Sequence, residues 1–172
     1  WMQALAGCVA AVVLASADAC AEAPPFGLFA VDAADIRRAI DRERPIERPA
    51  VSLTGLTVPH HLLAADLIAR GFWAATGGSY DKIVVLMPDH FRRSRRPFAT
   101  TTRGFVSAFG AVATDVEDTQ RLLETAELFE DSSLFEREHA LQALLPFIAE
   151  FFPRVKIVPV AVSIMSRSQA LA

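Results

Sequence analysis

Short runs of apolar residues along this chain have the length and composition of buried β-strands. Residues 82–87 and 155–162 consist mostly of aliphatic side chains, as strands covered on both faces do. Residues 50–58 alternate more loosely but are rich in Val, Leu and Thr, and they predict a further strand. Residues 91–110 show no clear period, and we expect irregular structure there.

Between these runs, apolar residues recur every three or four positions, the spacing of helices with one buried face. Asp32 and Asp115 stand where side-chain N-caps are expected. Pro146 lies inside the last pattern, so we expect a kink or a break there. The predicted helices are residues 33–42, 62–76 and 115–128, and one that begins at Ser133 and carries an apolar stripe from Leu141 to Phe152.

The order of these elements predicts the fold class. A strand, a helix, a strand, an irregular segment, two helices and a strand follow one another, and such alternation is typical of α/β folds. We therefore expect a mostly parallel, doubly wound sheet flanked by helices, an α/β sandwich. In such a sheet the first strand–helix–strand unit is right-handed, and its two strands end at the same edge.

This topology makes three histidines candidate site residues. His60 follows the first predicted strand and His90 follows the second, so both are expected at the sheet edge where ligands of α/β folds bind. His139 stands beside Glu138 near the start of the last helix and is expected to face the same crevice. Neutral imidazoles are common ligands of Zn, Cu and Fe. Asp89 or Glu138 would orient a ligand imidazole or complete a triad of ligands.

Other polar residues near these positions carry weaker signals. We interpret His61 as a neighbour of the site rather than a ligand. The arginines of the irregular segment form either a solvated loop or a contact for an anionic substrate or an anionic surface. These arginines are Arg92, Arg93, Arg95 and Arg96.

Composition narrows the class of protein. The chain has 172 residues, of which 52% are hydrophobic and 22% charged, which excludes a disordered chain. Its two cysteines, Cys8 and Cys20, exclude a disulfide scaffold. A net charge of −3 gives no general reason to expect nucleic acid as a partner.

The first segment differs from the rest of the chain. Residues 4–17 are almost entirely apolar, and an Ala-Cys-Ala triplet follows them. This pattern predicts a signal peptide or a membrane anchor over residues 1–24, with attachment to a membrane through residues 4–17 as one outcome. We expect an exported protein, periplasmic or membrane-associated, if this leader is genuine, and a cytoplasmic one otherwise. Residues 25–49 are interpreted as a polar lead-in.

Several motifs, in order and spacing, resemble the Memo-like family, whose bacterial members are labelled AmmeMemoRadiSam system protein B. The resemblance covers residues 50–163. This sequence departs from the family pattern at His61, where the family has Ala, and at Asp89, where the family has Ser. The matching motifs are Val58-Pro59-His60-His61, Met87-Pro88-Asp89-His90, Glu138-His139-Ala-Leu-Gln142 with Leu145-Pro146-Phe147, and the Lys156-Ile-Val-Pro159-Val160 strand.

The resemblance implies a fold similar to that of class III extradiol dioxygenases. It also implies a metal site with His60 and His90 as ligands, lined by His139 and Glu138 as acid/base residues, and holding copper or iron rather than zinc. The family's third ligand is a Cys of a later motif that this sequence does not include. We therefore expect a partial, C-terminally incomplete Memo-like domain over residues 50–172.

Three functions remain open on the sequence. The first is a metal-binding protein with redox or dioxygenase-like activity at the histidine site. The second is a non-catalytic module of the same fold that binds a protein or a small molecule. The third is a metal-dependent hydrolase whose anionic substrate is held by the arginines of residues 92–96.

Overall fold

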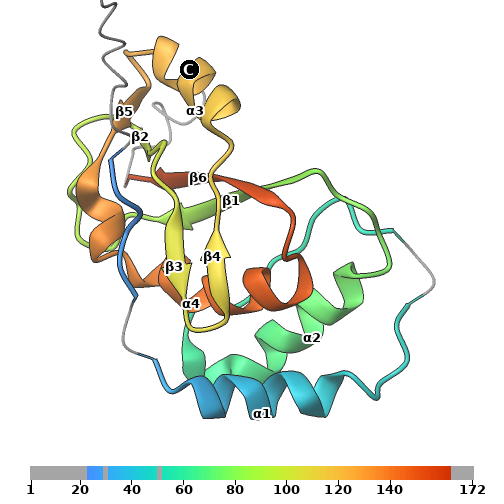
Figure 1. Ribbon diagram of the computed structural model, residues 1–172. Coiled ribbons are helices and arrows are strands. Elements are labelled where there is room, and N and C mark those ends of the chain that lie inside the picture. The colour runs from blue at the N-terminus through green and yellow to red at the C-terminus, as the bar shows by residue number, and fades with distance from the viewer. Residues whose placement is uncertain (1–22, 29–30, 50–51, 164–172) are drawn as a thin grey trace, which may run out of the picture.

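The computed structural model describes residues 23–28, 31–49 and 52–163. Its larger sheet has the strand order β1-β6-β2-β5 (Figure 1). β1 and β6 are parallel, as are β2 and β5, whereas β6 and β2 are antiparallel. The mostly parallel sheet of the predicted fold class is therefore confirmed. The strands are β1 (Lys82–Pro88), β2 (Phe98–Thr100), β5 (Phe129–Asp131) and β6 (Lys156–Val162).

Helices flank this sheet on both sides (Figure 1). α4 and α2 lie on one side with α1 beyond them, and α3 lies on the other. A hairpin of β3 (Phe105–Ser107) and β4 (Gly110–Val112) packs against α4. The helices are α1 (Ala33–Glu43), α2 (Ala65–Ala75), α3 (Val116–Glu124) and α4 (His139–Phe151), with short 3₁₀ helices η1 (Leu62–Ala64) and η2 (Ser133–Glu136).

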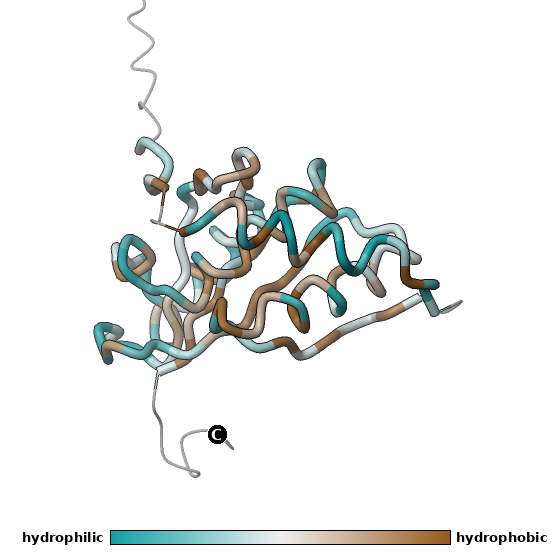
Figure 2. Tube along the Cα trace, turned by 90° about the horizontal axis from the view of Figure 1, so that it is seen from below, coloured by the Kyte–Doolittle hydropathy of each residue, from teal (hydrophilic) through white to brown (hydrophobic). Residues whose placement is uncertain are grey.

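The core centres on α4, whose residues from Ala140 to Ala149 are all buried. Phe147 is fully buried and stacks on Phe72 of α2, with ring centroids 6.1 Å apart. Burying one such side chain contributes about 1.5–3 kcal/mol, so α4 is the main support of the fold. Figure 2 shows hydrophobic segments through the middle of the molecule and hydrophilic ones along its outer loops.

Helix α1 belongs to this same core, although it lies in the predicted polar lead-in. Asp32 caps it as predicted and accepts the backbone N–H of Ala34 at 2.8 Å. Ile36 and Ile40 are buried against the core, and Glu43, itself buried, pairs with Arg70 of α2 at 2.9 Å. Most arginine and aspartate side chains of α1 are exposed, whereas Arg37 is half-buried and pairs with Glu150 of α4.

The strand predicted over residues 50–58 is wrong for the part that the structure describes. Residues 52–58 contain neither helix nor strand. Their Val, Leu and Thr content suits a strand, but only Leu53, Leu56 and Val58 are apolar side chains of any size, and Leu53 and Val58 pack on the core one by one. The predicted right-handed first unit therefore does not form from this segment.

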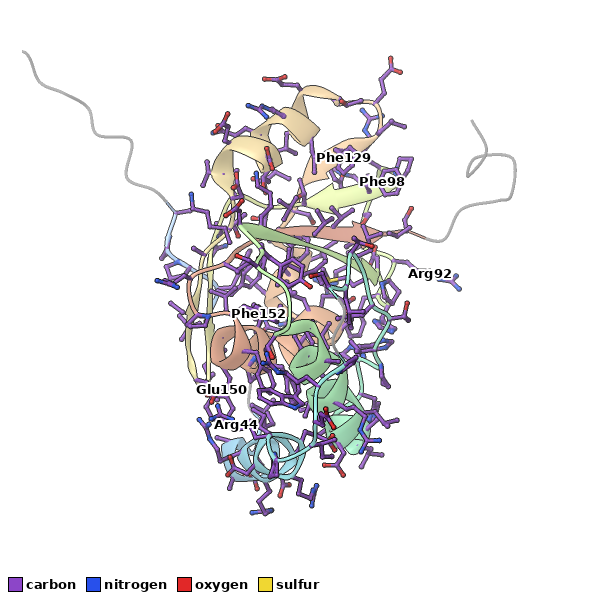
Figure 3. All side chains as sticks on the ribbon, turned by 90° about the vertical axis from the view of Figure 1, so that its right-hand side faces the viewer. Arg44, Arg92, Phe98, Phe129, Glu150 and Phe152 are labelled. Atoms are coloured by element: carbon purple, nitrogen blue, oxygen red, sulfur yellow. The ribbon has the colours of Figure 1, made fainter. Side chains whose placement is uncertain are left out.

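The four three-residue strands, β2 to β5, were not predicted. β2 and β3 lie within residues 91–110, and three residues are too few to show an alternating pattern. β5 follows α3 directly, so this helix ends at Glu124 rather than near residue 128. Phe98 of β2 and Phe129 of β5 lie side by side with ring centroids 5.0 Å apart (Figure 3), a packing contact that only the tertiary structure reveals.

The last predicted helix consists of two helices. Ser133 begins only η2, whereas α4 begins at His139 with Glu138 as its N-cap. Pro146 lies inside α4 without ending it. Proline removes one helical N–H, and the burial of nearly every neighbouring residue of α4 offsets that loss.

The predicted leader lies outside the described residues, except for its last two. Among the residues that the structure describes, no helix is both long enough and apolar enough to cross a membrane.

Candidate metal centre

His60 is carried by the segment without regular secondary structure that precedes η1. Val58 packs against Gly71 of α2 so closely that a side chain at Gly71 would place its Cβ 2.6 Å from Val58 Cγ1. This contact, which requires glycine in α2, holds the segment against the helix two residues before His60. His61 then caps η1, with its Nδ1 3.4 Å from a backbone nitrogen of that helix.

His90 is carried by the end of strand β1. The backbone N–H of Asp89 donates to Val162 at 2.9 Å, so the pairing with β6 extends past the last strand residue. The Asp89 side chain is buried and accepts the backbone N–H of Ser94 at 2.8 Å. The chain around His90 is thus fixed from both sides by backbone hydrogen bonds.

His139 is the first residue of α4, and Glu138 before it is fully buried. One carboxylate oxygen of Glu138 accepts the backbone N–H of Ala140 at 3.0 Å and lies 2.8 Å from His90 Nδ1. The other oxygen accepts the backbone N–H of His90 at 3.0 Å. Glu138 therefore joins the start of α4 to the end of β1.

The three imidazoles meet in one cluster. Ring centroids of His90 and His139 are 4.3 Å apart, those of His60 and His90 4.8 Å, and those of His60 and His139 5.8 Å. One nitrogen from each ring lies within 4.8 Å of the other two. Three imidazole nitrogens at this spacing can hold a metal ion of the Zn, Cu or Fe class.

No carboxylate among the described residues belongs to this cluster. Asp89 contacts only the backbone beside the cluster, whereas Glu138 contacts both the backbone and the ring of His90. The third imidazole of the cluster is that of His139. Asp89 Oδ1 is buried and has no hydrogen-bond partner in the described part of the chain. These carboxylates suit the orienting role predicted for them better than the role of a third ligand.

Burial lowers the pKa of His60 below its ordinary value of 6.5. The neighbouring His90 and His139 act in the same direction, because positive charges at the three rings repel one another. The Glu138 carboxylate opposes these effects without cancelling them. Since a metal binds only neutral imidazole, the environment of His60 favours the form that can act as a ligand.

The arginine loop follows His90 and projects outwards. Arg92 has a positive φ of 52° and extends away from the body of the molecule (Figure 3). Arg95 pairs with Glu130 of β5, whereas no ion pair between described residues involves Arg92, Arg93 or Arg96. An anionic substrate for this loop stays a prediction.

Sequence reasoning brought His60 and His90 together by an argument that was only half correct. His90 does end a strand, whereas His60 reaches the cluster from an irregular segment. The helix start at Glu138 and the bond from Asp89 to Ser94 were not predicted. Glutamate is not among the usual N-cap residues, and the stronger capping pattern at Ser133 favoured an earlier helix start.

Comparison with known proteins agrees with these motifs. A family model described as "Memo-like protein" matches residues 32–172. A MEMO1 family protein of Caldivirga maquilingensis is 31% identical over 87 residues, which are 48% of this chain and 31% of that relative. One of Aquifex aeolicus is 26% identical over 113 residues, which are 63% of this chain and 30% of that relative. The aligned part thus spans about a third of the length of these relatives, and the chain belongs to the Memo-like protein family.

Proposed function

We propose that this Memo-like protein binds a metal ion through His60, His90 and His139 and supports redox or dioxygenase-like chemistry there. The observation that carries the proposal is the meeting of three imidazole nitrogens within 4.8 Å of one another. The three histidines lie far apart in the sequence. Their meeting is therefore a product of the fold and not of sequence proximity.

The donor set fits the proposed metals. Imidazole nitrogen suits copper and iron as well as zinc, and the family resemblance favours the first two. A bound copper or iron ion would supply electron transfer or the activation of oxygen. The side chains of His90 and His139 are 30% and 35% exposed, so a metal and a small ligand can reach the cluster from solvent.

Neighbouring side chains orient the imidazole rings and cover part of their surface. Phe91 lies edge-on to His139, with centroids 6.0 Å apart, and covers part of that ring. His139 is either the third ligand or the acid/base residue of the site, and the geometry favours the ligand. The acid/base role predicted for His139 from the sequence requires that its ring stay free when metal is bound.

Metal content of single-histidine variants tests the proposal. We expect about one copper ion per chain in the wild type, loss of binding in the His60→Ala/His90→Ala double variant, and weakened binding in His139→Ala. His61→Ala is the matched control, because His61 adjoins the site but lies outside the cluster, and it should bind as the wild type does.

Each other outcome assigns a different function. If His139→Ala keeps its full metal content but loses the redox activity of the metal-loaded wild type, His139 is the acid/base residue. A folded wild type that binds neither copper nor iron would overturn the proposal and favour the non-catalytic module. Equal metal content in the wild type and the double variant would place any metal elsewhere on the chain.

A further inference from the structure

We propose that Glu138 is the positioning residue of the histidine cluster and fixes the ring of His90 with Nε2 presented to the metal. The metal part of this inference rests on the proposed function. The orientation and tautomer of the ring are properties of the metal-free protein and can be tested without any metal.

Glu138 holds His90 at two points at once. Its Oε2 accepts the backbone N–H of His90 at 3.0 Å, and its Oε1 lies 2.8 Å from Nδ1 of the same residue. A single carboxylate therefore constrains both the backbone and the side-chain torsions of His90. An imidazole anchored in this way loses little further freedom when a metal binds.

The choice of glutamate is not explained by capping alone. Helix N-caps are commonly Ser, Thr, Asp or Asn, whose short side chains reach the first turn. Glu138 caps α4 through the N–H of Ala140, and its longer side chain also reaches His90. A fully buried carboxylate is costly unless hydrogen bonds satisfy it. Here three N–H groups do so, and among the described residues its only ion-pair neighbours are His90 and His139.

The contact also fixes the chemistry of the ring. A carboxylate accepts hydrogen bonds and has no proton to donate, so Nδ1 of neutral His90 carries the hydrogen and Nε2 keeps its lone pair. A carboxylate that accepts from one imidazole nitrogen orients the ring and increases the basicity of the other. Glu138 is fully buried, and this position suits the orientation of His90 better than direct proton exchange with a substrate.

Two substitutions separate positioning from capping. Glu138→Ser keeps a good N-cap for α4 but is too short to reach His90. Glu138→Gln keeps the length and one oxygen acceptor, so it should retain part of the effect. Asp115→Ser is the matched control, because it also replaces an acidic N-cap by serine, at α3 instead of α4.

The first readout is the ¹⁵N imidazole spectrum of the metal-free chain at about pH 8.5, well above the ordinary histidine pKa. We expect His90 to show a protonated Nδ1 and an unprotonated Nε2 in the wild type and in Asp115→Ser. In Glu138→Ser this preference should disappear, and Glu138→Gln should lie between them. A spectrum of His90 that is unchanged in Glu138→Ser would overturn the inference.

The second readout is the Cu²⁺ dissociation constant, measured by competition with a chelator. We expect it to rise about 10–100-fold in Glu138→Ser and to stay unchanged in Asp115→Ser. An unchanged constant in folded Glu138→Ser would contradict the positioning role. A wild type that binds no Cu²⁺ would refute the proposed function, yet the ring spectrum would still decide what Glu138 does.

Discussion

The two segments that bring His60 and His90 together are built in different ways. His90 lies two residues after the paired strand β1 and is tied to α4 by the buried carboxylate of Glu138. His60 stands on a segment without helix or strand, which the structure holds by side-chain packing such as that of Val58 on Gly71. One half of the site is fixed by hydrogen bonds, whereas the other depends on the shape of a helix surface.

Regular secondary structure therefore does not need to carry every residue of such a cluster. Hydrogen bonds with defined directions fix a ring more closely than apolar contact does, because dispersion contacts are weak and non-directional. We therefore expect metal affinity to fall further when the polar partner of His90 is changed than when the packing beside His60 is disturbed.

Phe147→Ala removes the support that both sides share and should give the largest effect. Phe147 is fully buried in α4 and stacks on Phe72 of α2, the helix that carries Gly71. A phenylalanine truncated in a core costs about 3–5 kcal/mol, which urea unfolding measures. Leu63→Ala, at a side chain that is 94% exposed, should change the free energy of unfolding by less than about 0.5 kcal/mol. Equal midpoints for the two variants would contradict the central place of α4.

Gly71→Ala acts on the His60 side alone. The new methyl group would collide with Val58 Cγ1 and displace the segment before His60. The collision lowers the free energy of unfolding, whereas the higher helix propensity of alanine raises it by up to about 1 kcal/mol. Because the two effects oppose each other, the global stability should change little. We expect Cu²⁺ affinity to fall about tenfold, as for other losses of ligand support, with the His90 ring spectrum unchanged.

The double variant Gly71→Ala/Val58→Ala is the control for that collision. It removes the methyl group that the new Cβ would meet, and it should recover part of the affinity. If Gly71→Ala alone binds copper as tightly as the wild type does, the packing of Val58 on α2 does not position His60.

The smallest effect is expected at Asp115, which caps α3 and pairs with Lys82 of β1 but is no member of the histidine cluster. The backbone N–H of Asp118 and, beside it, the Lys82 ammonium lower the pKa of Asp115 below 3.8. The stabilisation that this shift provides is complete above about pH 4 and is lost as the pH falls through the folded-state pKa.

Asp115→Asn keeps an oxygen that caps the helix and removes the charge. Its thermal midpoint should therefore fall less than that of the wild type between about pH 4 and pH 2, with copper affinity at neutral pH unchanged. Parallel curves for the two proteins would show that the cap does not depend on the charge of Asp115.

The sequence was sufficient for the long elements and for most of the site. The helices α1 and α2 and the strands β1 and β6 have enough residues to display their periods. The three-residue strands do not, and their pairing depends on contacts between distant parts of the chain. His60 was correctly grouped with His90, but the packing that places it depends on the absence of a side chain at Gly71, which no periodic pattern reveals.

A ¹⁵N–¹H imidazole spectrum during titration with Zn²⁺ would show whether three of the four histidines form one metal site. The chain contains only four histidines, so every ring can be followed in one spectrum. We expect the signals of His60, His90 and His139 to change together at the same metal concentration, while those of His61 stay unchanged. Signals of the three rings that remain unchanged, or that respond at separate concentrations, would contradict a single metal site.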